Sequence, residues 1–317
     1  MKYVGLQTQI ANNNTKSVLL LVMFPVLILV LVYAFFLLIL TWGSPRTVSE
    51  AMPVANDLFL NAIPYVVFVV GVWFVIAYFA NTSIIRKSTG ARPLERRENK
   101  RVYNLVENLC MSIGMQMPQI NIIEDDSLNA FASGINDKTY TVTLSRGIIE
   151  KLDDEELEGV IAHELTHIRN RDVRLLIVSI VFVGIFSFLM QMAVNTMRYA
   201  SLGRSRNDKG GGGIIIVVAI LALAAIGYFF STIFRFAISR KREYMADAGA
   251  AQMTRRPWAL ASALKKISED SRIEAVTRDD VAQLFIEHPL EKKSMGISSL
   301  FATHPPIQKR IQVLEQF

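Results

Sequence analysis

The sequence contains very little cysteine and little histidine. Cys110 is the one cysteine, so the chain forms no intrachain disulfide and gives no sign of an oxidising compartment. Only 4 histidines are present among 317 residues. Two of these, His163 and His167, stand four positions apart, which makes their spacing more informative than it would be in a histidine-rich chain.

Acidic residues are outnumbered by basic ones, 28 to 34, and the formal net charge is +6. The basic residues cluster beside apolar runs, which is typical of membrane topology signals rather than of a nucleic-acid surface. We therefore predict no nucleic-acid partner. Hydrophobic residues make up 51% of the chain and the mean hydropathy is positive, which is unusual for a soluble protein and predicts contact with a lipid bilayer.

Long apolar runs predict an integral membrane protein with about four transmembrane helices. The first run is too long for the apolar region of a signal peptide, and no small-x-small cleavage site follows it, so we expect a retained helix. For the last two runs, the alternative is a pair of buried core helices. The four runs cover residues 18–40, 58–80, 175–197 and 214–234.

A burst of positive charge follows the second apolar run. By the positive-inside rule it places this side of the membrane in the cytoplasm. The basic residues are Arg86, Lys87, Arg92, Arg96, Arg97, Lys100 and Arg101, opposed by Glu95 and Glu98. The loop between the third and fourth runs is also basic and breaks this rule. That pair is either a tolerated exception or an embedded hairpin that does not fully cross.

The motif H-E-x-x-H occurs at His163, Glu164 and His167. Residues four apart lie on one face of a helix, so both imidazoles can point at one metal ion. Glu164 stands beside them, placed to take a proton from water, which is the arrangement of zinc hydrolases. The alternative is two surface histidines and a glutamate on an amphipathic helix. We predict one Zn²⁺ per chain.

The helix that this spacing requires is predicted over about residues 154–171. Asp153 is a good N-cap, and Glu156 stands three residues later, as a capping box requires. Negative charge in the first turn suits the helix dipole. Apolar residues recur at helical spacing through the motif, at Leu157, Val160, Ile161, Leu165 and Ile168.

A site with two histidines needs one more protein ligand, and Glu243 is the best candidate. Asp247 lies four residues further along the same predicted helix, where it can accept a hydrogen bond from the other nitrogen of a ligand histidine. The alternative is that Glu243 only balances the basic residues 240–242. Two apolar runs separate the motif from Glu243, and this even number places both on the same side of the membrane.

A small β-sheet is predicted before the motif helix, which makes the fold class α+β. Residues 119–123 read as a strand, and residues 139–144 alternate and are rich in β-branched side chains. We expect residues 129–134 to form a hairpin with the latter strand. An exposed edge strand here can bind an extended substrate as an additional strand. The alternative is an ordinary structural hairpin.

These motifs resemble the HtpX family of membrane zinc endopeptidases. They occur in that family's order over nearly the whole chain, from the histidine motif to Glu243 and Asp247. The resemblance implies a gluzincin-type fold on a membrane anchor in the bacterial inner membrane. It also implies ATP-independent cleavage of misfolded or damaged membrane proteins in quality control. CAAX prenyl endopeptidases are more distant, because they have more spans than this chain.

Two further stretches carry the same resemblance. The residues Asn129, Ala130 and Phe131 resemble the family's substrate-binding strand, and residues 301–306 with Arg310 resemble its C-terminal signature. The resemblance therefore implies that the strand binds substrate. It also places His304 and Arg310 near the site, where either group can stabilise an oxyanion or hold the substrate.

The chemistry expected from these residues is metal-assisted peptide hydrolysis. Zinc on His163, His167 and Glu243 polarises the scissile carbonyl, and Glu164 passes a proton from water to the leaving amine. One alternative is a membrane scaffold or regulator with a closed structural zinc, although no cysteine near the motif supplies a fourth ligand. The others are a CAAX-type processing endopeptidase and another zinc hydrolase, such as an esterase.

The expected layout alternates membrane regions with the two halves of a catalytic domain. An N-terminal region with two spans precedes the sheet and motif helix, and a membrane hairpin precedes the half with the third ligand. These four regions are residues 1–82, 83–174, 175–238 and 239–317.

Overall fold

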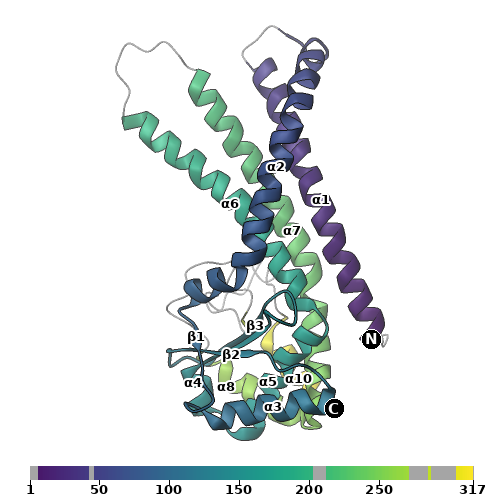
Figure 1. The fold of residues 1–317 in the computed structure, drawn as a ribbon, viewed down its shortest axis with the longest axis vertical. Helices are drawn as coiled ribbons and strands as arrows, with labels where there is room; N and C mark the ends of the chain where they lie inside the picture. The colour runs from purple at the N-terminus through teal and green to yellow at the C-terminus, as the bar shows by residue number, and fades with distance from the viewer. Residues whose placement is uncertain (1–5, 43–45, 203–211, 271–284, 287–304, 317) are drawn as a thin grey trace. The chain divides into compact units, whose positions relative to one another are not determined.

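The computed structural model describes residues 6–42, 46–202, 212–270, 285–286 and 305–316. His304 and the rest of the predicted signature at 301–304 lie outside these ranges. The elements, labelled in Figure 1, are α1 (Leu6–Thr41), α2 (Val48–Thr89), β1 (Arg92–Pro93), α3 (Lys100–Ile113), β2 (Gln119–Ile123), β3 (Ala130–Ser133), β4 (Thr141–Ser145), α4 (Arg146–Lys151), α5 (Asp154–Arg169), α6 (Asp172–Leu202), α7 (Gly212–Thr254), α8 (Pro257–Ile267) and α10 (Ile307–Leu314).

The chain divides into two compact units. The sheet unit comprises Met1–Ser17, Phe79–Val178 and Arg235–Phe317, and the apolar unit comprises Val18–Tyr78 and Ser179–Phe234. The long helices α6 and α7 each contribute to both units.

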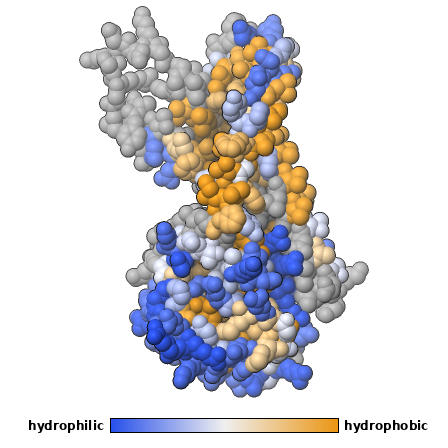
Figure 2. Space-filling view, viewed as in Figure 1, coloured by the Kyte–Doolittle hydropathy of each residue, from blue (hydrophilic) through white to orange (hydrophobic). Residues whose placement is uncertain are grey.

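The apolar unit contains the two helices that are long and apolar enough to cross a membrane among the described residues. Their apolar windows are Val22–Thr41 and Val48–Ile76. Large hydrophobic side chains point outward from α2, including Tyr65 at 76% and Phe68 at 70% exposure, and hydrophobic surface gathers over α1 and α2 (Figure 2). Such surface is stable in lipid rather than in water. The structure therefore supports two of the four expected spans, and full crossing by the third and fourth apolar runs remains a prediction.

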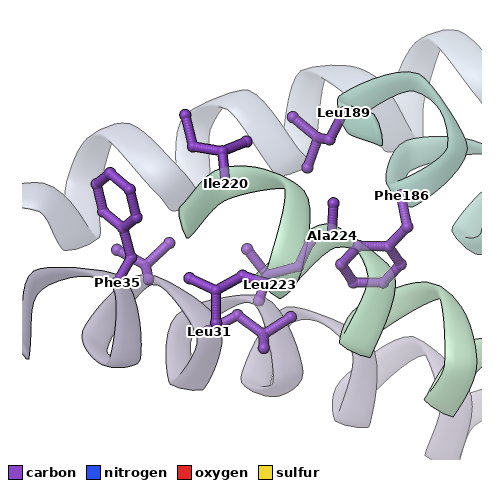
Figure 3. Close-up of a pocket in the computed structure, with 9 residues that line it drawn as sticks. Leu31, Phe35, Phe186, Leu189, Ile220, Leu223 and Ala224 are labelled. Carbon is purple, nitrogen blue, oxygen red and sulfur yellow. The ribbon is translucent and has the colours of Figure 1, made fainter. Parts of the chain in front are cut away.

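A cavity of about 250 Å³ lies within the apolar unit, between α1, α6 and α7 (Figure 3). Only hydrocarbon side chains line it, which makes it unsuitable for a peptide backbone, whose polar groups need hydrogen-bond partners. Its lining residues are Ile28, Leu31, Val32, Phe35, Phe186, Leu189, Ile220, Leu223 and Ala224. The chemistry of this protein therefore has to be sought in the sheet unit.

The sheet has four strands in the order β1-β2-β4-β3. β2 pairs with β4 in parallel, whereas β3 pairs with β4 as the predicted antiparallel hairpin, with Ala130 opposite Leu144. Gly134 ends β3 with a φ of 112°, and a Cβ there would lie 2.4 Å from the carbonyl oxygen of Thr139, so the turn requires glycine. β1 was not predicted, because two residues that include a proline carry no strand pattern.

Helix α5 carries the histidine motif and begins as predicted. Asp153 accepts a hydrogen bond from the Glu156 amide at 2.9 Å, and the Glu156 side chain accepts one from the Asp153 amide at 3.1 Å, which completes the capping box. The helix ends at Arg169, two residues earlier than expected, because Arg171 adopts a φ of 60° that an α-helix does not allow. α5 packs against β3 and β4 and also contacts α3 and α8.

Candidate metal centre and active site

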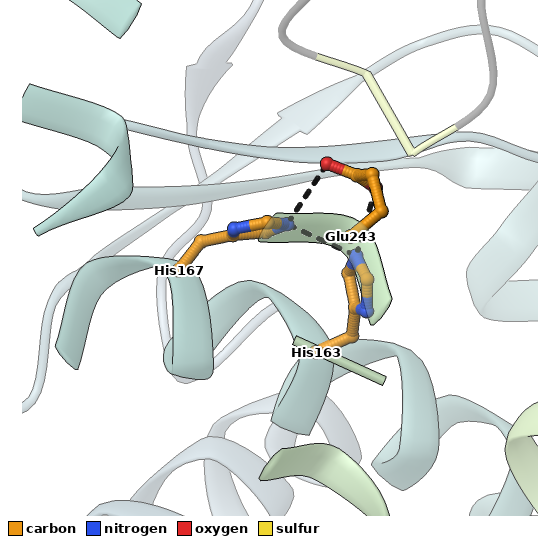
Figure 4. A group of neighbouring side chains, drawn as sticks. All are labelled: His163, His167 and Glu243. Atoms are coloured by element: carbon orange, nitrogen blue, oxygen red, sulfur yellow. Dashed lines mark hydrogen bonds and ion pairs between the residues drawn. The ribbon is translucent and has the colours of Figure 1, made fainter. Parts of the chain in front are cut away.

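Helices α5 and α7 bring together three side chains that could hold a metal ion, as Figure 4 shows. The Nε2 atoms of His163 and His167 lie 3.1 Å apart. Glu243 Oε2 lies 3.7 Å from the first of these nitrogens, and Glu243 Oε1 lies 3.6 Å from the second. Residues 76 positions or more apart in the chain therefore form the group that the spacing predicted.

The donor set and its spacing fit a zinc ion. Two ligands that bind one tetrahedral zinc at about 2.0–2.1 Å are about 3.4 Å apart, close to the three separations observed here. The His163 side chain is fully buried, whereas 13% of the His167 side chain is exposed, so the group can be approached from the His167 side. Among the described residues the group has three donors, which is the number that a catalytic zinc site uses.

Asp247 lies beside the first histidine, within reach of the hydrogen bond expected from the sequence. Its Oδ1 lies 3.0 Å from His163 Nδ1. With the proton held on Nδ1, the lone pair of Nε2 faces Glu243 and the other imidazole, as a metal ligand requires. Burial disfavours the charged imidazole, but hydrogen bonds with Asp247 and Glu243 outweigh it and raise the pKa of His163 to about 9. Metal binding must therefore displace a proton from this histidine.

Asp172 contacts the second histidine, and sequence reasoning missed it. Its Oδ2 lies 3.2 Å from His167 Nδ1, and its side chain is 2% exposed. Because Asp172 is five residues beyond His167, it would not face that histidine on a continuous helix. The break at Arg171 starts a new helix at Asp172 and permits the contact. The available signal in the sequence was a carboxylate a few residues after His167, close to the end of the helix.

Arg310 lies at the centre of the same charge cluster. It is fully buried, and its Nε and Nη2 donate to the two carboxylate oxygens of Asp247 at 2.9 and 2.7 Å. Its Nη1 lies 3.5 Å from Glu243 Oε2. The Arg310 charge and the hydrogen bond from His163 outweigh burial and lower the pKa of Asp247. The sequence placed Arg310 near the site through resemblance alone, and here it pairs with Asp247.

Glu164 follows the first histidine on α5 and is 2% exposed. Burial raises the pKa of its carboxyl group, against the opposing influence of His163 and His167. A carboxylate with a raised pKa is a better proton acceptor near neutral pH than an ordinary glutamate. This environment suits the general base that the motif predicts.

A glycine sets how closely α7 approaches α5. A Cβ at Gly249 would lie 2.4 Å from Thr166 Cγ2. Ala246 and Ala250, on either side of it in α7, are fully buried. These small side chains let the helix that carries Glu243 pack directly on the helix that carries the histidines. The sequence contains the small residues, but only the structure identifies Thr166 as their neighbour.

The strand proposed for substrate binding is at the edge of the sheet, as expected, but it is not exposed. Asn129 and all four residues of β3 are buried. The outer side of Phe131 bridges Phe285 in antiparallel fashion, and Ile286 donates to the Ala130 carbonyl at 2.8 Å. The expectation of an open edge was therefore wrong, because a segment more than 150 residues later in the chain covers it.

Known proteins resemble this chain over both halves of the site. The sequence model of peptidase family M48 matches residues 96–317. A Protease HtpX homolog from Bacteroides fragilis is 66% identical over 322 aligned residues, with 100% of both chains covered. One from Listeria monocytogenes is 34% identical over 316 residues, covering 97% of this chain and 98% of the relative. The crystal structure of S. mikatae Ste24p aligns with 90% of this chain and 61% of its own, at a TM-score of 0.47 and 20% identity.

Proposed function

This chain belongs to peptidase family M48 and is a membrane metalloprotease, and on that premise we propose that it is a zinc endopeptidase with His163, His167 and Glu243 as its metal ligands. The observation that carries the proposal is the convergence of these three donors, at separations of 3.1, 3.6 and 3.7 Å. Two imidazoles and one carboxylate are a donor set of catalytic zinc sites. Zinc at this site supplies Lewis acidity, which polarises a carbonyl and makes water more acidic.

The protein's own residues then have distinct tasks. Glu164 takes a proton from the attacking water and passes it to the leaving amine. Asp247 and Asp172 hold the two imidazoles with their Nδ1 atoms protonated, which leaves both Nε2 atoms available to the metal. Arg310 compensates the charge of Asp247 and lies close to Glu243. Asn129, Ala130 and Phe131 bind the substrate as an extended strand, with β3 as the template.

The membrane part of the proposal concerns topology and substrates. All four apolar runs cross the bacterial inner membrane, and both halves of the catalytic domain, residues 83–174 and 239–317, lie in the cytoplasm. The basic residues after the second run support this orientation. The substrates are misfolded or damaged membrane proteins, cleaved without ATP in membrane quality control. The similarity to bacterial Protease HtpX homologs supports proteolysis as the activity.

Zinc content and casein cleavage of the detergent-purified protein test the active site. Glu164→Gln should retain one zinc per chain and cleave about 10²- to 10⁴-fold more slowly than the wild type, because only the proton acceptor is lost. Glu155→Gln, an exposed change on the same helix, is the matched control and should cleave normally. If wild type and Glu164→Gln bind zinc equally and neither cleaves, the catalytic assignment is wrong.

Labelling of introduced cysteines tests the topology. Cys110 is buried, so a thiol reagent that cannot cross membranes should report on an added cysteine instead. Ser44→Cys and Ser205→Cys lie in the two loops expected outside the cytoplasm and should be labelled in intact cells. Ser112→Cys, in the sheet unit, should be labelled only after lysis. Protection of Ser205→Cys in intact cells would contradict full crossing by the third and fourth runs.

A further inference from the structure

The outer edge of β3 is occupied by two residues of the chain's own C-terminal part. Phe285 and Ile286 are 0% and 2% exposed. Phe285 pairs with Phe131 in an antiparallel bridge, and Ile286 donates its amide to the Ala130 carbonyl at 2.8 Å. The rings of Phe285 and Phe131 are 4.6 Å apart between centroids and tilted by 58°. Both backbone pairing and side-chain contact therefore hold this segment on the edge strand.

The same segment is tied to the metal group through Arg310. The Ile286 carbonyl accepts a hydrogen bond from Arg310 Nη1 at 3.1 Å. That guanidinium also contacts both carboxylate oxygens of Asp247, and its Nη1 lies 3.5 Å from Glu243 Oε2. Arg310 thus links a peptide carbonyl at the position of Ile286 to Glu243, a proposed zinc ligand, and to Asp247, the hydrogen-bond partner of His163. An extended peptide in this place has one end beside the catalytic group.

We propose that Phe285–Ile286 occupies the place of an extended peptide substrate on β3, and that substrates with a bulky apolar or aromatic residue bind by displacing it. The inference rests on the proposed function of β3 as the substrate-binding strand. Backbone pairing accepts any sequence, whereas the Phe131 ring packs against the Phe285 ring and therefore favours a similar side chain. Phe285–Ile286 therefore resembles the preferred substrate and competes with it for β3.

Displacement requires a substrate that pairs with β3 in place of Phe285 and Ile286. One bridge, one amide hydrogen bond and one ring contact join the two described residues to β3, and the Ile286 carbonyl accepts a further hydrogen bond from Arg310. A longer substrate strand can pair along the whole of Ala130–Ser133. While the segment stays bound, only the fraction of molecules with an open edge binds substrate, and the apparent affinity falls by that fraction.

Steady-state kinetics of Phe285→Ala test the competition in the full-length, zinc-loaded protein. If the segment competes with substrate, its weakening should lower KM for a fluorogenic extended peptide about three- to tenfold while kcat and zinc content stay unchanged. Phe68→Ala, the same chemical change on the exposed face of α2, is the matched control and should leave KM unchanged. An unchanged or increased KM for Phe285→Ala overturns the proposal and makes the segment a structural strand.

A synthetic peptide tests the specificity separately from catalysis. The peptide VAQLFIEHPL, which repeats residues 281–290, should bind zinc-loaded Glu164→Gln in a fluorescence anisotropy assay. Replacing its phenylalanine by alanine should weaken binding at least fivefold. Equal binding of the two peptides, or no binding of either, overturns the proposal. Because this assay needs no hydrolysis, its outcome is distinguishable from a failure of the proposed catalytic mechanism.

Discussion

The two units of this protein differ in the polar side chains they bury and the hydrophobic side chains they expose. The sheet unit buries charge: the side chains of His163, Asp247 and Arg310 are at most 2% exposed and contact one another. The apolar unit exposes large hydrophobic residues such as Phe68, and its internal cavity is lined only by hydrocarbon. In the sheet unit, the buried charged residues form the proposed active site. In the apolar unit, the exposed hydrophobic residues indicate that lipid surrounds it.

The difference follows from the surroundings of each unit, which are water for the sheet unit and lipid for the apolar unit. Hydrophobic burial drives folding in water, so the sheet unit should bury charge only where partners or a metal compensate for lost hydration. In lipid, exposed hydrocarbon has no such penalty, and small gaps between helices fill with apolar side chains or lipid. A substitution of one chemical type should therefore have very different effects in the two units.

The largest effect is expected when the buried charge cluster is broken. Arg310→Met removes the guanidinium that pairs with both oxygens of Asp247 and lies 3.5 Å from Glu243 in a buried site, which should cost about 3–5 kcal/mol of folding free energy. Thermal unfolding of the purified protein measures this loss. Arg97→Met, which removes a cation that is 82% exposed, is the control and should change stability by less than about 1 kcal/mol. Similar losses in both variants would show that the cluster is not a coupled unit.

The next effect concerns the carboxylate that orients His167. Asp172→Asn should weaken zinc binding about 10- to 100-fold, because the ligand histidine loses a charged hydrogen-bond partner. Competition with a zinc chelator measures the affinity, and the zinc-saturated variant should recover most of the wild-type folding stability. Asp137→Asn, at an exposed turn of the same unit, is the control. If Asp172→Asn retained wild-type zinc affinity, Asp172 would have no orienting role.

Adding a methyl group at a glycine tests how tightly each unit is packed. Gly249→Ala should destabilise the protein by about 1–3 kcal/mol and reduce zinc affinity, because the new Cβ meets Thr166. Gly71→Ala adds the same methyl group in the apolar unit, where nothing lies within 4 Å, and should be nearly neutral. Thermal unfolding of both variants makes the comparison. Thr166→Ser removes the clashing methyl and should partly rescue Gly249→Ala, whereas no rescue would argue against this contact.

The smallest effect is a pH dependence in the metal-free protein. The pKa of His163 is raised to about 9 in the folded state, above its ordinary value of 6.5. Its protonated form therefore stabilises the fold fully below about pH 6.5, and this contribution disappears as the pH rises through about 9. The melting temperature of the protein freed of metal by a chelator should fall over this pH range. With zinc bound the imidazole is already deprotonated, so the same decline in the zinc-loaded protein would contradict the assignment.

Local patterns were sufficient to predict the elements that carry the metal ligands. The capping box at Asp153 and Glu156 and the apolar repeat along α5 depend on neighbours within a turn or two of one helix. Glu243 and Asp247 were predicted in the same way, since their spacing of four places them on one helical face. The pairing of β3 with β4 followed from alternation and a glycine turn. Short-range sterics and hydrogen bonding determine each of these features.

The remaining features depend on contacts between distant segments, which no local pattern specifies. Asp172 reaches His167 only because the chain breaks at Arg171. The role of Arg310 as partner of Asp247, and the cover of β3 by Phe285, follow from where the C-terminal segments pack. The sequence by itself thus determined the proposed metal ligands and the apolar runs, since helical period and hydropathy are local properties. Tertiary structure alone decided which charges compensate the site and what occupies the substrate edge, because packing selects those partners.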